Sequence, residues 1–305
     1  MIASMGELLV EFVCVDKDLH HLTPARYFGP FPSGAPGIFI DQAARIAGRA
    51  MFAGAVGDDT FGQVLLDRLR AAGVCDDLIR VVTGAPTGTA HVAYNSDGSR
   101  EFVFNIACSA AGHLPDAAEA MIRAGVTCLH ISGSTLGDPG MRNTALALCK
   151  SLHAQGVAIS IDPNIRTELM RDAGYLLAVR AIIAMATYVL PSDADAAALW
   201  PGQAFEAWAA GLTGARAVVL KRGGDGCVGF GDSSVDLPAH PVTVIDPTGA
   251  GDCFCGTFVA LMEMGHDLRH ALTHANAAGA LAVSKLGPME GNADLPTIQA
   301  FLKGY

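Results

Sequence analysis

Short apolar runs alternate with helix-like patterns through the middle of the chain. Apolar, β-branched runs predict strands at residues 126–131, 157–161, 187–190 and 217–221. Residues 141–154 show the spacing of a helix, and residues 63–72 place Leu65, Leu66 and Leu69 on one helical face. Each predicted strand ends in polar or glycine-rich residues. Repeated units of this kind predict a parallel sheet with helices on both faces, which binds ligands at its carboxyl edge.

A different pattern occupies residues 87–106. Two alternating runs flank the polar stretch at residues 95–99, which is a β-hairpin signal. Together with the stretch around residues 10–30, this hairpin could form a small β-sheet over the main one. A further strand is predicted over residues 5–13. Glu11 lies late in that strand, where it either contacts a ligand at the sheet edge or is simply solvated.

Residues 241–262 carry the chemistry. The apolar run 242–245 predicts a short buried strand, the sequence DPTGAG at 246–251 breaks it, and an apolar helix begins at Asp252. A helix start beside a glycine turn leaves backbone N–H groups free for an anion. The carboxylate of Asp252 could take a proton from a hydroxyl that attacks a phosphoryl group held there. A tight turn followed by a helix cap is the plainer alternative.

Composition narrows the function classes. Of 305 residues, 51% are apolar and only 16% charged, and the net charge of −10 argues against nucleic acid or anionic lipid as partners. Eight cysteines are scattered without a CxxC pair, which predicts reduced thiols and not a disulfide framework or a zinc site. The first residues lack a signal-peptide pattern, and no apolar run reaches the ~20 residues of a membrane span. We therefore expect one cytoplasmic domain over residues 1–305.

Three motifs resemble signatures of the ribokinase-like (PfkB-type) carbohydrate kinases: DPTGAGD at 246–252, VGDDTFG at 56–62 and DPNIR at 162–166. The resemblance covers nearly the whole chain. It implies a doubly wound, mostly parallel sheet flanked by helices, with a β-sheet lid formed by about residues 10–35 and 87–106. In such kinases the residue matching Asp252 is the catalytic base, and the amides matching Gly249, Ala250 and Gly251 form an anion hole. The lid excludes water from the transfer site, and it often also forms a homodimer contact.

The resemblance also assigns binding residues. The sugar would contact Gly34, Arg166, Asp252, the lid residue Asn105 and Glu11, which stands where the family commonly has Asp. Ile38 replaces a sugar-binding Asn of the family, and Asp41, one helical turn on, either substitutes for it in part or is an ordinary surface acid. The nucleotide would contact Ser192, Lys221, Gly223, Gly226, Gly249, Gly251, Asn276 and Gly279. Asp195 would hold Mg²⁺ through water, and Asp246 and Ser284 would bind a monovalent cation such as K⁺.

These assignments predict an ATP-dependent sugar kinase that phosphorylates a primary hydroxyl. A ketohexose such as tagatose or fructose leads, because Asn105 offers no charge to an acid sugar and Arg166 is the one evident cation. Ketodeoxygluconate kinase and ribokinase are the alternatives within the family. A sensor protein on the same fold is a non-enzymatic alternative, against which the intact Gly249–Asp252 motif argues. A dinucleotide-dependent dehydrogenase would need G-x-G-x-x-G after the first strand, which is missing here.

Overall fold

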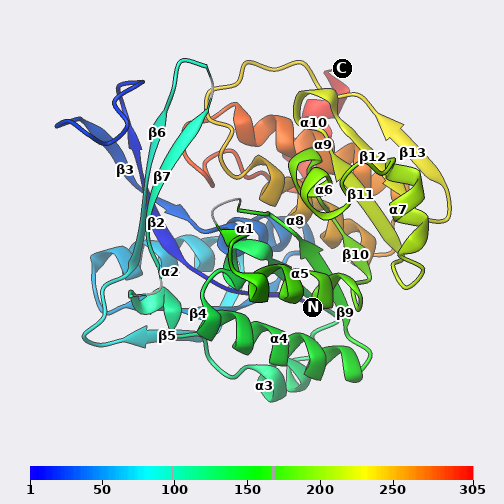
Figure 1. Ribbon diagram of the computed structural model, residues 1–305, viewed down its shortest axis with the longest axis horizontal. Coiled ribbons are helices and arrows are strands. Elements are labelled where there is room, and N and C mark those ends of the chain that lie inside the picture. Colours follow the sequence, from blue (N-terminus) through cyan, green and yellow to red (C-terminus); the bar gives the residue numbers. More distant parts are fainter. Residues whose placement is uncertain (98, 107, 167–168, 305) are drawn as a thin grey trace.

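A nine-stranded sheet forms the centre of the molecule (Figure 1). The computed structural model describes residues 1–97, 99–106, 108–166 and 169–304. The strands from β11 to β5 run parallel, and β12 and β13 continue the sheet antiparallel, which confirms the predicted mostly parallel sheet. In spatial order the strands are β13 (Ser234–Leu237), β12 (Cys227–Phe230), β11 (Ala217–Lys221), β10 (Tyr188–Val189), β9 (Ala158–Asp162), β8 (Cys128–Ser132), β1 (Ile2–Met5), β4 (Ala50–Gly57) and β5 (Val74–Val82).

Helices cover both faces of this sheet. One face packs against α1 (Ala35–Ala47), α2 (Thr60–Ala72), α8 (Ala250–Glu263), α9 (Leu268–Val283) and α10 (Leu295–Lys303). The other packs against α3 (Ala118–Arg123), α4 (Pro139–Ala154), α5 (Ala173–Ile183), α6 (Asp193–Leu199) and α7 (Phe205–Gly211). Successive strand residues enter opposite cores, as Phe52 and Ala53 do, because side chains alternate across a strand. Short 3-10 turns lie at Ala110–Gly112, Gly133–Leu136 and Gly223–Asp225.

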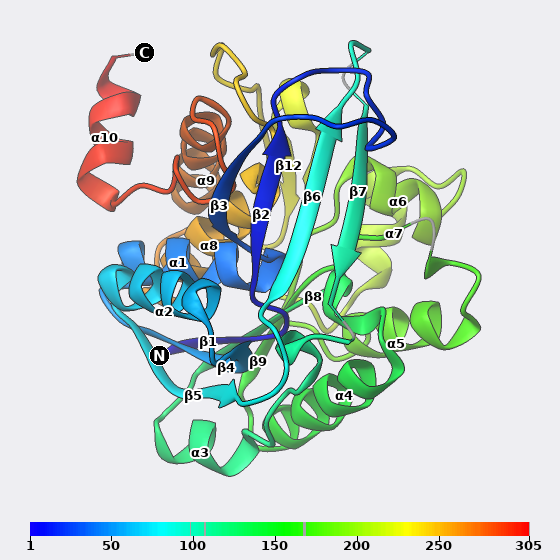
Figure 2. The same cartoon turned by 90° about the vertical axis from the view of Figure 1, so that its left-hand side faces the viewer.

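A second, four-stranded sheet stands beside the main one (Figure 2). We call it the lid: β3 (Tyr27–Ser33), β2 (Leu9–Cys14), β6 (Gly88–Tyr94) and β7 (Arg100–Asn105), in this spatial order. The hairpin predicted over residues 87–106 is the β6–β7 pair, with an antiparallel register of Thr89 opposite Asn105. The predicted small sheet is therefore confirmed. Among the described residues, no helix is long and apolar enough to span a membrane.

The single strand predicted over residues 5–13 is wrong, because the chain leaves the main sheet after Met5 and enters the lid at Leu9. Gly6 marks the crossing. A Cβ atom at this position would lie 2.3 Å from the Thr135 hydroxyl oxygen, so a side chain does not fit there. Apolar residues continue on both sides of this crossing, and the hydrophobic pattern therefore gave no sign that the chain changes sheets.

The buried strand predicted at residues 242–245 is also wrong. These residues form an irregular segment, in which Val244 is 60% and Ile245 57% exposed. The antiparallel strand β13 already ends the sheet, and Pro238 and Pro241 interrupt the chain that follows it. The amides of Ile245 and Asp246 donate instead to the carbonyl of Val283, at the end of α9. β-branched composition favours a strand here, but among the described residues this segment pairs with no strand.

Candidate active site

A cavity of about 790 Å³ opens between the lid and the carboxyl edge of the main sheet. Its size lies within the range usual for small-molecule sites. Open α/β sheets bind ligands at this edge, because loops and helix N-termini gather there. The lid contributes Glu11, Arg100, Phe102 and Phe104 to the lining, the sheet edge contributes Asp162, Arg166 and Lys221, and the start of α8 contributes Gly249, Gly251 and Asp252. The motifs at residues 162–166 and 246–252 therefore meet in one place, whereas residues 56–62 do not line the cavity.

The N-terminus of α8 is open toward this cavity. Its first residue is Ala250, Gly249 precedes it with a φ of 79°, and no side chain caps the free amides. Gly249 is needed for the fold, because a Cβ atom there would lie 2.3 Å from the carbonyl oxygen of Pro288. A Cβ atom on Gly251 would meet only the Lys221 ammonium, at 3.5 Å. Gly251 thus leaves free space where an anion can approach the helix dipole.

Asp252 lies in the first turn of α8 and lines the cavity. Burial raises the pKa of its carboxyl group to about 8, and the nearby Asp162 carboxylate adds to this rise. The positive charges of Lys221 and Arg166 oppose the rise only in part. A carboxylate with a pKa near neutrality is suited to accept a proton from a substrate hydroxyl, because general bases work best close to the operating pH.

Lys221, predicted to contact the nucleotide, forms a buried ion pair with Asp162. Its ammonium also donates to Sγ of Cys255 at 3.4 Å. Burial alone would lower the pKa of Lys221, but the Asp162 carboxylate outweighs that effect and holds the pKa above its usual value. The ammonium therefore stays charged. It lies beside the open end of α8, where it adds positive potential next to Gly251.

Two glutamates from the start of the chain lie at the lid side of the cavity. The Glu11 carboxylate is buried; its Oε2 accepts from the Ser33 hydroxyl at 3.1 Å, while Oε1 has no hydrogen-bond partner among the described residues. Burial raises the pKa of Glu11 to about 7. The alternative of a solvated edge residue does not fit this burial. Glu11 instead lines the cavity and has a buried carboxylate oxygen without a partner, to which a sugar hydroxyl could donate.

Glu7 is a cavity residue that the sequence analysis missed. Its carboxylate is also buried and accepts from the hydroxyls of Ser134, at 2.6 Å, and Thr135, at 2.8 Å. Burial raises the pKa of Glu7 above its ordinary value. The available signal was a second acid in the same apolar run as Glu11, at the point where the chain passes between the sheets.

Arg166 lines the cavity as predicted, and a second cation that the sequence analysis missed, Arg100, does the same. The guanidinium carbon of Arg166 lies 5.9 Å from the ring centroids of both Phe102 and Phe104, and that of Arg100 lies 5.6 Å from Phe102. Within the described part of the chain, neither guanidinium has an ion-pair partner. Both are therefore available to an anionic group in the cavity.

The assignment of Asn105 to the sugar is corrected by the alternation of β7. Arg100, Phe102 and Phe104 face the cavity, and Asn105 lies on the opposite face of the strand, because side chains two residues apart share a face. Its amide donates to the Thr89 hydroxyl at 3.1 Å, across the β6–β7 pair, and the residue is exposed. The residue of β7 that brings a charge to the cavity is Arg100.

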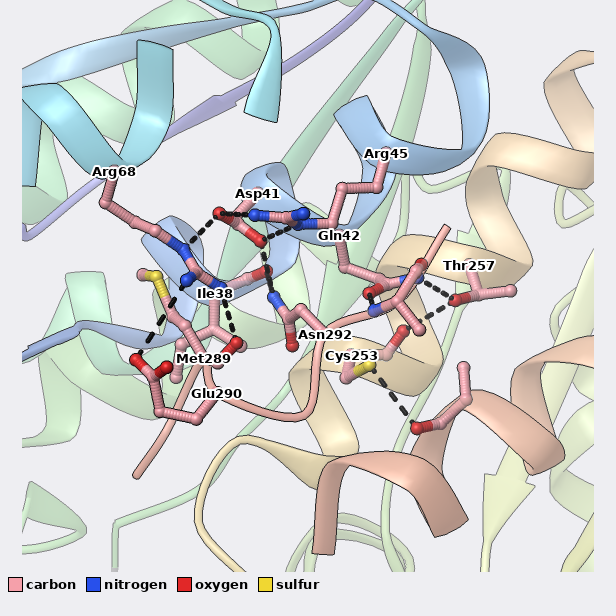
Figure 3. A network of polar contacts seen from close by, with 12 residues as sticks. Ile38, Asp41, Gln42, Arg45, Arg68, Cys253, Thr257, Met289, Glu290 and Asn292 are labelled. Carbon is pink, nitrogen blue, oxygen red and sulfur yellow. Dashed lines mark hydrogen bonds and ion pairs between the residues drawn. The ribbon is translucent and has the colours of Figure 1, made fainter. Parts of the chain in front are cut away.

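Asp41 is placed differently from both alternatives. It is fully buried in α1 and does not line the cavity. Its Oδ2 lies 2.7 Å from Nε of Arg45 and accepts a hydrogen bond from the Asn292 amide at 2.9 Å. Its Oδ1 lies 2.8 Å from Nε of Arg68 in α2 (Figure 3). Two guanidinium groups and an amide satisfy this buried charge. Asp41 is therefore a structural ion pair and not a sugar ligand.

The same network holds the loop at residues 287–293 (Figure 3). Arg68 donates to the carbonyl of Met289, and Gln42 exchanges hydrogen bonds with both backbone groups of Ala293. This loop includes Pro288, whose carbonyl packs against Gly249. The buried polar groups of α1 thus help to fix the wall behind the open end of α8.

The remaining predicted residues fall into two groups. Gly34, with a φ of 103°, Ser192, Asp195 and Gly223 line the cavity. Asp195 forms a capping box with Ser192 at the start of α6 and also accepts from the amide of Ile165 at 2.6 Å, so its carboxylate already has protein partners. Gly226, Asn276 and Gly279 do not line the cavity. A Cβ atom on Gly226 would lie 2.0 Å from the carbonyl oxygen of Leu237, and the Asn276 amide donates to the carbonyl of Pro238 at 2.7 Å.

The candidate residues for a monovalent cation also have protein partners. Asp246 is fully buried and accepts hydrogen bonds from the Tyr94 hydroxyl and from the amides of Thr248 and Gly287. The Ser284 hydroxyl donates to the carbonyl of Leu281 at 2.7 Å. In the part of the chain that the structure describes, no three His, Cys, Asp or Glu residues are grouped to hold a metal ion.

Comparison with known proteins agrees with this arrangement. The profile of the pfkB family of carbohydrate kinases matches residues 1–295. Probable fructokinase-4 of Arabidopsis thaliana is 32% identical over 324 residues, covering 100% of this chain and 97% of the relative. An E. coli protein provisionally described as ribokinase II, solved with ATP and Mg²⁺, has a TM-score of 0.92 at 35% identity, over 100% of this chain and 99% of that one. Vibrio cholerae fructokinase, solved with fructose, ADP and calcium, has a TM-score of 0.83 at 25% identity, over 99% and 98%.

The chain therefore belongs to the pfkB family of carbohydrate kinases. Its fold is the ribokinase-like fold expected from the sequence, including the separate lid sheet. It is an ATP-dependent sugar kinase.

Replacing the candidate base should separate catalysis from stability. We expect Asp252→Asn to fold and to lose roughly 10²- to 10⁴-fold in turnover, the usual size of a general-base effect. The folded pKa of about 8 exceeds the ordinary value of 3.8, so the contribution of Asp252 to stability is greatest below its ordinary pKa and is lost as the pH rises through about 8. The melting temperature of Asp252→Asn, measured relative to that of the wild type, should therefore increase as the pH rises to about 8. Asp193→Asn, an exposed first-turn acid of α6, is the control; near-normal turnover of Asp252→Asn would remove Asp252 from the mechanism.

A second variant tests the open helix end. The first side-chain carbon of Gly251→Val meets only the end of Lys221, so we expect the protein to fold and melt close to the wild type. The β-branched side chain should nevertheless block the approach of a phosphate to the amides, and steady-state kinetics should show a loss of about 100-fold or more in kcat/KM for ATP. Wild-type kinetics in Gly251→Val would show that this turn is only structural.

Proposed function

We propose that the enzyme phosphorylates the primary hydroxyl of a ketohexose, with fructose as the leading candidate and tagatose next. The observation that carries this proposal is the placement of Asp252 in the first turn of an uncapped helix, in one cavity with Glu11, which has an unpartnered carboxylate oxygen. The curated relatives named as fructokinases, at about 30% identity, support fructose. Residues 1–305 would act as one kinase unit, with a lid at about 10–35 and 87–106 that covers the sugar.

The proposed mechanism follows from the placement of these groups. Glu11 accepts a hydrogen bond from a sugar hydroxyl and orients the ring. Asp252 removes the proton of the primary hydroxyl while the hydroxyl oxygen of the sugar forms a bond to the γ-phosphorus of ATP. The bond from that phosphorus to the bridging oxygen breaks, and ADP leaves. The amides of Gly249, Ala250 and Gly251 stabilise the charge on the transferring group, because they point to where it develops. Arg166 adds a positive charge on the same side of the cavity.

The residues present fit a magnesium–nucleotide complex. The uncapped amides of α8 and the free space at Gly251 can receive phosphate oxygens, and Gly223, which has a φ of 52° and no neighbour in reach of a Cβ atom, leaves room beside the nucleotide. Mg²⁺, when bound to the phosphates, neutralises part of their charge. Asp195 would hold it through water, since Mg²⁺ usually keeps several water ligands. Asp246 and Ser284 remain the proposed site for K⁺, and Ser192, Lys221, Asn276 and Gly279 remain proposed nucleotide contacts.

An acid sugar such as 2-keto-3-deoxygluconate is the second candidate, and Arg100 is the observation that favours it. A carboxylate in a partly closed site needs a cation, because an unpaired buried charge costs several kcal/mol. Arg100 could pair with that carboxylate while Arg166 pairs with the phosphoryl group. Because Arg100 and Arg166 both line the cavity, a sugar carboxylate and a phosphoryl group need not share one guanidinium.

Two further features are proposed. A homodimer could form through the outer face of the lid, where Val103 is 48% exposed and apolar contact area is available. The cytoplasm would suit the eight cysteines, all of which are free thiols in the structure.

A panel of sugars distinguishes the two candidates. We expect kcat/KM for the best ketohexose to exceed that for 2-keto-3-deoxygluconate by at least about tenfold, which is ~1.4 kcal/mol of transition-state preference. Arg100→Ala should then change KM for the ketohexose little, and Asn105→Ala, on the outer face of β7, is the matched control.

A preference for the acid sugar that Arg100→Ala abolishes and Asn105→Ala spares would establish the second candidate. A wild-type protein that consumes no ATP with any sugar would contradict both candidates and leave the sensor alternative.

A further inference from the structure

We propose that Tyr94 is a positioning residue that couples the lid to the anion hole. Tyr94 ends β6 of the lid, and it does not line the cavity itself. Its hydroxyl lies 2.5 Å from Oδ1 of Asp246 and 2.8 Å from the hydroxyl of Thr248. Asp246 and Thr248 lead directly into the Gly249–Gly251 amides. This inference rests on the kinase reaction and not on which sugar is the substrate.

The hydrogen bonds around Tyr94 have one consistent direction. Asp246 is acceptor-only when ionised, so the Tyr94 hydroxyl donates to it, and the Thr248 hydroxyl in turn donates to the Tyr94 oxygen. Arg100 of β7 extends the chain of contacts, because its Nη1 lies 3.5 Å from the Thr248 hydroxyl. Both strands of the lid hairpin therefore contact the segment before the anion hole.

Asp246 connects this contact to the backbone of the anion hole. Its Oδ1 accepts from the amide of Thr248 at 2.9 Å, and its Oδ2 accepts from the amide of Gly287 at 3.0 Å. The next residue, Pro288, places its carbonyl against Gly249. One buried carboxylate thus joins the lid, the approach to α8 and the loop behind Gly249. A shift of Tyr94 changes the support of Asp246, and the amides of Gly249–Gly251 move with it.

A coupling role and a merely structural role predict different kinetics. If Tyr94 orients the anion hole, removing its hydroxyl weakens stabilisation of the transferring phosphoryl group while the contacts that bind sugar and ATP remain. The loss then falls on kcat and not on KM, because the interaction matters in the transition state. Misplacement of catalytic groups by about 1 Å can cost on the order of 100-fold in rate. A tie that only holds the lid in place would change the melting temperature or the KM for sugar.

The experiment compares Tyr94→Phe with Tyr27→Phe, using the sugar that the wild-type enzyme phosphorylates best. Tyr27 is the matched control, because it lies in the lid strand β3 and its hydroxyl is 2.9 Å from Nδ1 of His21, in the segment between β2 and β3. We expect Tyr94→Phe to lower kcat roughly 10- to 100-fold, with KM for sugar and ATP within about twofold of the wild type. Tyr27→Phe should keep kcat within about twofold. Thr248→Ser should retain most of kcat because it keeps the hydroxyl, and Thr248→Val should lose it.

The double variant Tyr94→Phe/Thr248→Val should lose little more than the stronger single variant, since both act through one contact. Unchanged kcat in Tyr94→Phe would overturn the proposal, and so would a rise in KM alone or an equal loss in Tyr27→Phe. If Tyr94→Phe does not fold, the difference between Thr248→Ser and Thr248→Val decides, and equal kcat in these two variants overturns the proposal. A wild-type enzyme that rejects ketohexoses but accepts another sugar would contradict the proposed substrate and leave this test intact.

Discussion

The open N-terminus of α8 is the constraint on which the site depends. A helix start normally finds a side chain to cap its free amides. The α8 amides have no such cap. Burial raises the pKa of Asp252, the first acidic residue of the helix, to about 8. Both features cost stability, since the amides have no side-chain cap and the surroundings of the half-buried Asp252 disfavour its charged form. Both become useful when a phosphoryl group meets the amides and a hydroxyl proton meets the carboxylate.

The surrounding structure holds this helix end in place from three sides. The Asp41 network of α1 and α2 fixes the loop at residues 287–293, and the Pro288 carbonyl of that loop packs against Gly249. The Lys221–Asp162 ion pair of the sheet edge lies in front of Gly251. The lid reaches the segment before Gly249 through Tyr94 and Asp246. Buried polar networks of this kind keep reacting groups within the small tolerance that catalysis needs.

Local patterns in the sequence were sufficient for much of this account. The DPTGAGD motif located Asp252 and the glycine turn, and the alternating runs around residues 95–99 located the lid hairpin. Local patterns do not predict the contacts between segments that are distant in the sequence. Asp41 was considered for the sugar because helical spacing puts it near Ile38, but its partners Arg68 and Asn292 come from other elements. Asn105 was chosen by position along β7, whereas the pleat of the strand decides which residues face the cavity, and that pleat selects Arg100.

The pH dependence of kcat/KM shows whether the half-buried carboxylate of Asp252 acts as the base. Only the deprotonated form of Asp252 can accept a proton, so kcat/KM for the preferred sugar at saturating ATP should rise about tenfold per pH unit below about pH 8 and level off above it. Glu11, whose pKa is about 7, could add to this limb, and the measurement is therefore repeated with Glu11→Gln. The account predicts that the rise near pH 8 persists in Glu11→Gln. A wild-type profile that is flat between pH 6 and 9, or a rise that disappears in Glu11→Gln, would contradict it.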